Sequence, residues 1–145
     1  MVRHTAQPMP PFIHTLRVRY HECDPQAIVF NAQYFAYFDI AITELWRTAF
    51  ERSYATMITD FGIDMVVAEA TARYHGSARF DDLIDVEAQI IRLGTTGMTT
   101  RLRVLRGDDV LVEGELRHVF VDAQDWTKTP IPEPVRAALS PFTAP

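Results

Sequence analysis

The sequence predicts a two-layer α+β domain in which one antiparallel sheet curls around a single apolar helix. Two observations support this fold class. Residues 31–52 carry apolar side chains at helical spacing, and residues 63–121 hold successive segments with strand character. A helix and a sheet that each have an apolar side bury those sides against one another. The length of 145 residues suits one domain. We therefore predict a loose arm over residues 1–11 and a single domain over residues 12–145.

The first predicted strand leads into a turn. Leu16, Val18 and Tyr20 alternate with polar residues, which is the period of a strand with one buried face. Pro25 interrupts the alternation and opens the turn. The strand is therefore expected to include Tyr20.

The long helix is expected to begin at Asn31, whose side-chain oxygen can cap the free N–H groups of the first turn. From there to about Arg52, apolar and aromatic residues cover most of the helix surface, and polar residues occupy a narrow strip. Such a helix must be largely enclosed by other structure.

The remainder of the chain predicts strands joined by glycine-containing turns, and then a short helix near residues 134–140. The sheet is expected to have about five strands and open edges. A sheet of this kind often completes its core by self-association, so a homodimer or homotetramer is expected. The predicted strands span residues 63–74, 85–93, 98–106 and 110–121.

The amino-acid composition indicates which binding partners and which cellular compartment to expect. The net charge of −5 argues against nucleic acid as a partner. No stretch reaches the length of about 18 apolar residues that a membrane-spanning helix needs. Cys23 is the single cysteine, which excludes an internal disulfide and fits a reducing cytoplasm. The histidines show no metal-ligand spacing, so no metal site is expected.

Two sequence blocks resemble a known family. They are Asp24-Pro-Gln-Ala-Ile-Val-Phe-Asn-Ala-Gln-Tyr34, which is followed by an aromatic helix containing Asp39, and Tyr74-His-Gly-Ser-Ala-Arg-Phe-Asp-Asp82. Together they resemble the hotdog-fold acyl-CoA thioesterases of the 4-hydroxybenzoyl-CoA thioesterase family. The resemblance spans about residues 13–130. It implies hydrolysis of an acyl- or aroyl-CoA thioester to a carboxylic acid and free coenzyme A. The coenzyme A ester would be the substrate, and no cofactor is expected.

The resemblance also implies roles for individual residues. Asp24 would be the nucleophile or general base, Tyr20 would position it, and backbone N–H groups near Asn31 would stabilise the oxyanion. Two positions depart from the family pattern. Ala27 replaces a glycine, and Asn31 replaces a histidine and cannot carry a proton. The expected substrate-binding residues are Ala27, Val29, Phe30, Tyr34, Arg79 and Arg92.

The residues alone leave alternatives open. Asp24 could simply brace the Pro25 turn. Glu22 could be a second carboxylate of an acid–base pair, although a solvated residue at the strand end is the simpler expectation. His118 is expected to be an interior histidine with a satisfied hydrogen bond. The alternative functions are a hotdog-fold acyl-thioester hydratase or dehydratase, and a non-catalytic dimer that binds acyl ligands.

Overall fold

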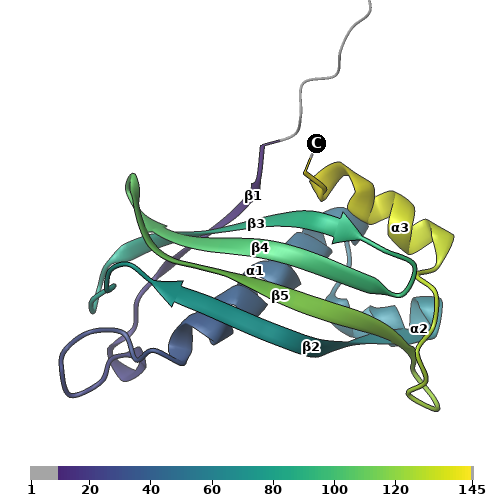
Figure 1. Cartoon of the computed structure of the whole chain (residues 1–145), viewed down its shortest axis with the longest axis horizontal. Helices are drawn as coiled ribbons and strands as arrows, with labels where there is room; N and C mark the ends of the chain where they lie inside the picture. The colour runs from purple at the N-terminus through teal and green to yellow at the C-terminus, as the bar shows by residue number, and fades with distance from the viewer. Residues whose placement is uncertain (1–9, 145) are drawn as a thin grey trace, which may run out of the picture.

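A computed structural model describes residues 10–144, in which one antiparallel sheet of five strands forms the larger layer (Figure 1). The strand order across the sheet is β1-β3-β4-β5-β2, so β1 and β2 lie at the two edges. Residues 1–9 of the predicted arm lie outside the described residues. The strands are β1 (Phe12–Arg17), β2 (Ile63–Tyr74), β3 (Leu83–Leu93), β4 (Gly97–Arg106) and β5 (Asp109–Asp122).

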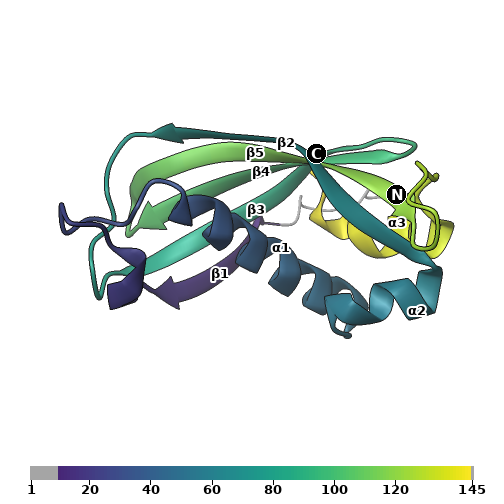
Figure 2. The same ribbon diagram turned by 90° about the horizontal axis from the view of Figure 1, so that it is seen from below.

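The second layer is the helix α1 (Gln33–Phe50), which crosses one face of the sheet (Figure 2). Its buried side meets the apolar side chains that β3, β4 and β5 direct toward it, and together these form the core. This arrangement confirms the predicted α+β architecture. The buried residues of the helix are Tyr34, Tyr37, Phe38, Ala41, Ile42, Leu45 and Trp46.

Shorter helices close the ends of the sheet. They are α2 (Met57–Phe61), α3 (Glu133–Leu139) and three 3₁₀ turns, η1 (Tyr20–Glu22), η2 (Tyr54–Thr56) and η3 (Ser140–Phe142). The Arg136 guanidinium of α3 donates to the carbonyls of Leu93 (3.3 Å) and Gly94 (2.6 Å), which holds α3 against the β3–β4 hairpin. Within the described part of the chain, no helix is long and apolar enough to cross a membrane.

Two predicted boundaries are wrong. β1 ends at Arg17, and Tyr20 lies in the 3₁₀ turn η1. The alternation of apolar residues continues past the last paired residue because Val18 is still buried although it lies outside β1. The helix α1 starts at Gln33 with Ala32 as its N-cap residue, and no side chain caps it. Asn31 therefore does not perform the predicted capping role.

Candidate active site

The turn that carries Asp24 is a closed loop held by backbone hydrogen bonds. The Asp24 N–H donates to the Ile28 carbonyl (2.9 Å), and the Phe30 N–H donates to the Glu22 carbonyl (3.0 Å). At its tip, Ala27 has a φ of 64°, in the left-handed region that favours glycine. This is the position at which the family pattern has glycine, and Ala27 adopts the left-handed conformation there in spite of its Cβ atom.

Asp24 combines a structural contact with a free carboxylate oxygen. Its Oδ1 accepts a hydrogen bond from the Gln26 N–H (2.8 Å), which is the bracing role expected of an Asp before a proline. Among the described residues, no hydrogen bond to Oδ2 is found. The half-buried side chain lines a cavity of about 570 Å³. The other residues around this cavity are Tyr20, Cys23, Pro25, Ala27 and Phe80.

The start of α1 offers unpaired backbone donors. The Gln33 N–H donates to the Phe30 carbonyl (2.9 Å), whereas the N–H groups of Asn31 and Ala32 donate no hydrogen bond within residues 10–144. Free N–H groups at a helix start favour negative charge. The Asn31 carbonyl accepts a hydrogen bond from the Tyr74 hydroxyl (2.9 Å), which ties this end of the helix to the end of β2.

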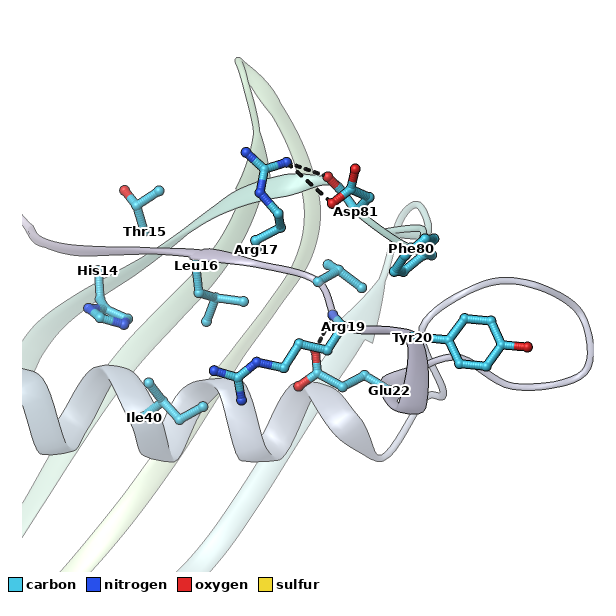
Figure 3. Close-up of a pocket in the computed structure, with 11 residues that line it drawn as sticks. His14, Thr15, Leu16, Arg17, Arg19, Tyr20, Glu22, Ile40, Phe80 and Asp81 are labelled. Carbon is cyan, nitrogen blue, oxygen red and sulfur yellow. Dashed lines mark hydrogen bonds and ion pairs between the residues drawn. The ribbon is translucent and has the colours of Figure 1, made fainter.

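A second cavity of about 630 Å³ lies between β1 and α1 (Figure 3). Tyr20 and Phe80 line both cavities, and their rings meet edge to face with centroids 5.7 Å apart. The two cavities therefore adjoin at this aromatic pair. Arg17 and Arg19 line the second cavity, and Arg17 forms an exposed ion pair with Asp81 at 3.7 Å. Neither arginine is in the predicted substrate-binding set, because strand alternation assigns both of them simply to the polar side of β1.

Glu22 is buried, which corrects the expectation of a solvated residue at the strand end. It is 5% exposed. Its carboxylate accepts hydrogen bonds from the Tyr37 hydroxyl (3.0 Å), the Arg19 N–H (2.7 Å) and the Gln33 side-chain amide (3.3 Å). Burial, reinforced by the Glu22 carboxylate, raises the pKa of the Tyr37 phenol, so Tyr37 remains a donor. Glu22 thus fastens η1 to α1, and it also lines the cavity of Figure 3.

Tyr20 lies in the 3₁₀ turn η1 and not in a strand as predicted. Its side chain is 80% exposed and reaches the cavity beside Asp24 from η1. No hydrogen bond joins its hydroxyl to another described residue, so the contact it makes with the site is the aromatic one with Phe80. Phe80 itself was not among the predicted site residues. Its signal was its place in the second sequence block, directly after Arg79.

The predicted substrate-binding residues fall into three groups. Val29 and Tyr34 belong to the core at 2% exposure, and neither lines the cavity beside Asp24. Ala27, Phe30 and Arg79 are exposed residues of the turn and of the loop before β3. Arg92 lies near the other end of β3, beside the β3–β4 hairpin, so within one chain it is remote from Asp24 (Figure 1).

No metal centre is found within residues 10–144, because no three His, Cys, Asp or Glu side chains are grouped so that they could hold an ion. The site therefore consists of a carboxylate, two adjoining cavities and a helix start with free N–H groups. A carboxylate and unpaired backbone donors are the groups that acyl transfer requires, since donors stabilise an oxyanion and a carboxylate acts as base or nucleophile.

Comparison with known proteins identifies relatives of this arrangement. The family model of the thioesterase superfamily matches residues 26–113. The acyl-CoA thioester hydrolase YbgC of Escherichia coli is 27% identical over 123 residues, which cover 84% of this chain and 90% of that protein. The acyl-CoA thioesterase YbgC of Haemophilus influenzae is 26% identical over 128 residues, covering 88% and 93%.

Among solved structures, a thioesterase superfamily protein of Jannaschia sp. CCS1 superposes with a TM-score of 0.88. It is 21% identical, and the match covers 96% of this chain and 99% of that one. At this identity the likeness concerns the fold.

Proposed function

The chain belongs to the thioesterase superfamily, has the predicted hotdog fold and is a thioester hydrolase, and on that premise we propose that it hydrolyses acyl-coenzyme A esters through Asp24. The names of the Escherichia coli and Haemophilus influenzae relatives support coenzyme A esters as the substrate class. The observation that carries the role of Asp24 is its place beside a cavity with one carboxylate oxygen free of hydrogen bonds.

Two routes are open to the Asp24 carboxylate. As a nucleophile it attacks the thioester carbonyl, coenzyme A leaves as the thiolate, and water hydrolyses the resulting mixed anhydride. As a general base it takes a proton from a water molecule that attacks the same carbonyl. In both routes negative charge develops on the carbonyl oxygen. The free N–H groups of Asn31 and Ala32 are the proposed donors to it. No cofactor enters either route.

The aromatic pair of Tyr20 and Phe80 is the proposed wall against which the thioester lies, because it separates the two adjoining cavities. Tyr20 would orient the substrate by contact, and its hydroxyl is free to bond the ligand. Arg79, beside Phe80, is the proposed contact for a coenzyme A phosphate. Ala27 and Phe30 are proposed to contact the acyl-CoA from the turn, where both are exposed.

The test is a thiol-release assay of Asp24→Asn against aromatic and aliphatic acyl-CoA esters. We expect kcat to fall by about 100-fold or more, since the amide can neither attack nor accept a proton. Asp108→Asn, a substitution in the exposed β4–β5 turn, is the matched control and should keep full activity. Full turnover by a correctly folded Asp24→Asn variant would exclude the proposed role. Enoyl-CoA hydration measured in parallel distinguishes a hydratase, and ligand binding without thiol release distinguishes a non-catalytic binder.

A homodimer or homotetramer in the cytoplasm is also part of the proposal. Within the described residues, β2 pairs with β5 alone, which leaves the other side of a twelve-residue strand open. Residues 67–71 of this edge are exposed. A long open edge of this kind favours pairing with another copy. Light scattering on the purified chain tests this, and a monomer at micromolar concentration would contradict it. The single Cys23 is in keeping with a reducing compartment.

A further inference from the structure

The start of α1 contains two peptide groups whose N–H atoms are free and whose carbonyls are both held. The Phe30–Asn31 peptide carries the Asn31 N–H, and its carbonyl accepts a hydrogen bond from the Gln33 N–H (2.9 Å). The Asn31–Ala32 peptide carries the Ala32 N–H, and its carbonyl accepts from the Tyr74 hydroxyl (2.9 Å). Because a peptide group is planar, a bond that holds its carbonyl also sets the direction of its N–H. These two hydrogen bonds therefore orient the two proposed oxyanion donors.

The second of these bonds is made by a side chain because the helix does not supply it. In a regular α-helix the Asn31 carbonyl would accept from the N–H of Phe35, four residues further on. Here the Phe35 N–H donates to the Ala32 carbonyl instead (3.2 Å). Among the described residues, the Tyr74 hydroxyl is the one donor to the Asn31 carbonyl. Hydrogen bonds in a chain polarise one another, so this bond also makes the Ala32 N–H a stronger donor.

Tyr74 is itself held in place by the sheet and by α1. It is the last residue of β2 and lies opposite Val112 of β5. Its ring meets the ring of Tyr34 edge to face, with centroids 5.8 Å apart. Tyr34 is buried, and its hydroxyl accepts from the Ala78 N–H (3.0 Å). The end of β2 thus lies beside the start of α1 and supports it (Figure 2). Support of this kind is what keeps a group of an active site in its productive geometry.

The exposure of Tyr74 separates this bond from the packing of the core. The side chain is 49% exposed, so water can reach it. When the Tyr74 hydroxyl is removed, water can take its place on the Asn31 carbonyl, and the loss of stability should be small. A water molecule does not fix the plane of a peptide as a side chain anchored in a sheet does. Loss of the hydroxyl should therefore disturb the direction of the Ala32 N–H more than the stability of the fold.

Other polar side chains around α1 have no such connection to the helix start. The Tyr54 hydroxyl donates to Asp64 Oδ1 (2.7 Å), which joins η2 to β2. His118 is 5% exposed, and its Nδ1 atom has no hydrogen-bond partner among the described residues. This corrects the expectation of an interior histidine with a satisfied hydrogen bond. In the described part of the chain, Tyr74 is the one residue whose side chain bonds a backbone group of residues 30–32.

We propose that Tyr74 is a positioning residue, whose hydroxyl fixes and polarises the Asn31–Ala32 peptide so that the Ala32 N–H points at the carbonyl oxygen of the thioester. The inference rests on the proposed hydrolysis of acyl-CoA esters and extends it by naming the side chain that orients an oxyanion donor. Tyr74 acts through the peptide and not by contact with the substrate. Its effect should therefore fall on kcat, since the negative charge on that oxygen develops only in the transition state.

The first experiment compares two substitutions that each remove one tyrosine hydroxyl. Loss of an entire oxyanion donor costs about 100- to 1,000-fold in kcat, so loss of its orientation in Tyr74→Phe should cost about tenfold. KM should stay within about twofold of the wild type. Tyr54→Phe is the matched control, because its hydroxyl bonds Asp64 and no group of the helix start. It should keep the wild-type kcat. An unchanged kcat in Tyr74→Phe, a change in KM alone, or an equal loss in Tyr54→Phe would overturn the proposal.

A double-mutant cycle tests whether Tyr74 acts through Ala32. Ala32 has a φ of −73°, which proline can adopt, and its N–H donates no hydrogen bond within residues 10–144. Ala32→Pro therefore removes the proposed donor without breaking a bond of the fold. We expect its kcat to fall, and Tyr74→Phe to cause no further loss in the Ala32→Pro background. Losses that multiply in the double variant would show that Tyr74 acts by another route. Thermal melting verifies that each variant is folded.

A spectroscopic measurement decides the question without turnover, and also if Ala32→Pro does not fold. Benzoyl-CoA and butanoyl-CoA, isotope-labelled at the thioester carbonyl, are bound to the Asp24→Asn variant, and the carbonyl stretching frequency is recorded by infrared difference spectroscopy. A hydrogen bond to the carbonyl lowers this frequency. Adding Tyr74→Phe should return it toward the value of the free ester, and adding Tyr54→Phe should not. A lowered frequency that Tyr74→Phe leaves unchanged overturns the role of Tyr74 alone. Absence of both binding and thiol release in the wild type overturns the proposed function, and this inference with it.

Discussion

Two buried polar side chains flank α1, and they differ in how their hydrogen-bonding capacity is used. Glu22 and His118 are each 5% exposed. Glu22, on the β1 side, accepts from Tyr37, Arg19 and Gln33, whereas His118, on the β2 side, has a fully buried nitrogen without a partner. The contrast teaches that burial alone does not identify a functional group. A buried polar group with several partners in its own chain stabilises the fold, while a buried group without a partner adds a desolvation cost to it.

The largest expected effect on stability comes from removing the hydrogen-bonded carboxylate of Glu22. Glu22→Ala leaves the Tyr37 hydroxyl and the Arg19 N–H without their acceptor, so the free energy of unfolding should fall by about 3 kcal/mol. Urea denaturation measures this. Glu115→Ala, on the exposed surface of β5, should cost less than about 0.5 kcal/mol. If both variants lost equally little, the distinction between the two sides of α1 would not hold.

The second effect is a pH dependence specific to His118. Its pKa is about 4 in the folded protein and near 6.5 when exposed, so the unfolded chain binds more protons between these values. The neutral ring's contribution to stability is thus fully present above about pH 6.5 and decreases as the pH falls toward 4, by at most about 3 kcal/mol. The difference in unfolding free energy between wild type and His118→Gln isolates this slope from that of the carboxylates. A difference that stays constant from pH 7 to pH 4.5 would contradict it.

The smallest effect has the opposite sign from the first. Replacing an unpaired buried polar group by an apolar one removes a desolvation cost, so His118→Leu should raise the unfolding free energy of the ligand-free protein by about 1 kcal/mol. The same denaturation assay measures it. A loss of several kcal/mol would indicate that His118 is paired in solution, which would place it in the same class as Glu22.

Much of the fold follows from periodicity in the sequence. The alternation in residues 98–106 and 110–121 predicts β4 and β5 to within a residue at each end, and the apolar spacing predicts the body of α1. The ends of strands and helices, which depend on local backbone geometry, are harder to predict from the sequence. Val18 continues the alternation because it packs into the core without belonging to the ladder of β1, so the pattern cannot show that Tyr20 is already in a 3₁₀ turn.

Even less of the candidate site than of the fold could be predicted from the sequence. Asp24 could be selected because the turn and the helix start adjoin in sequence. The partners of Glu22 could not be foreseen, since Tyr37 lies fifteen residues away and meets it only after α1 docks on η1. The orphan nitrogen of His118 is likewise invisible, because alternation predicts that the residue points inward and says nothing of what it meets there. The sequence also cannot show that Arg79 lies in the loop before β3 while Arg92 lies near the far end of that strand.

The turn that carries Asp24 is also cross-linked to the loop between β2 and β3. The Val29 N–H donates to the Ala78 carbonyl (2.9 Å), the Ala78 N–H donates to the Tyr34 hydroxyl (3.0 Å), and the Tyr74 hydroxyl donates to the Asn31 carbonyl. A local opening that frees the turn must break bonds held by the other loop, so the two loops should open as one cooperative unit. A substrate that displaces the loop of Phe80 would then also move the turn of Asp24, because the two loops open and close together.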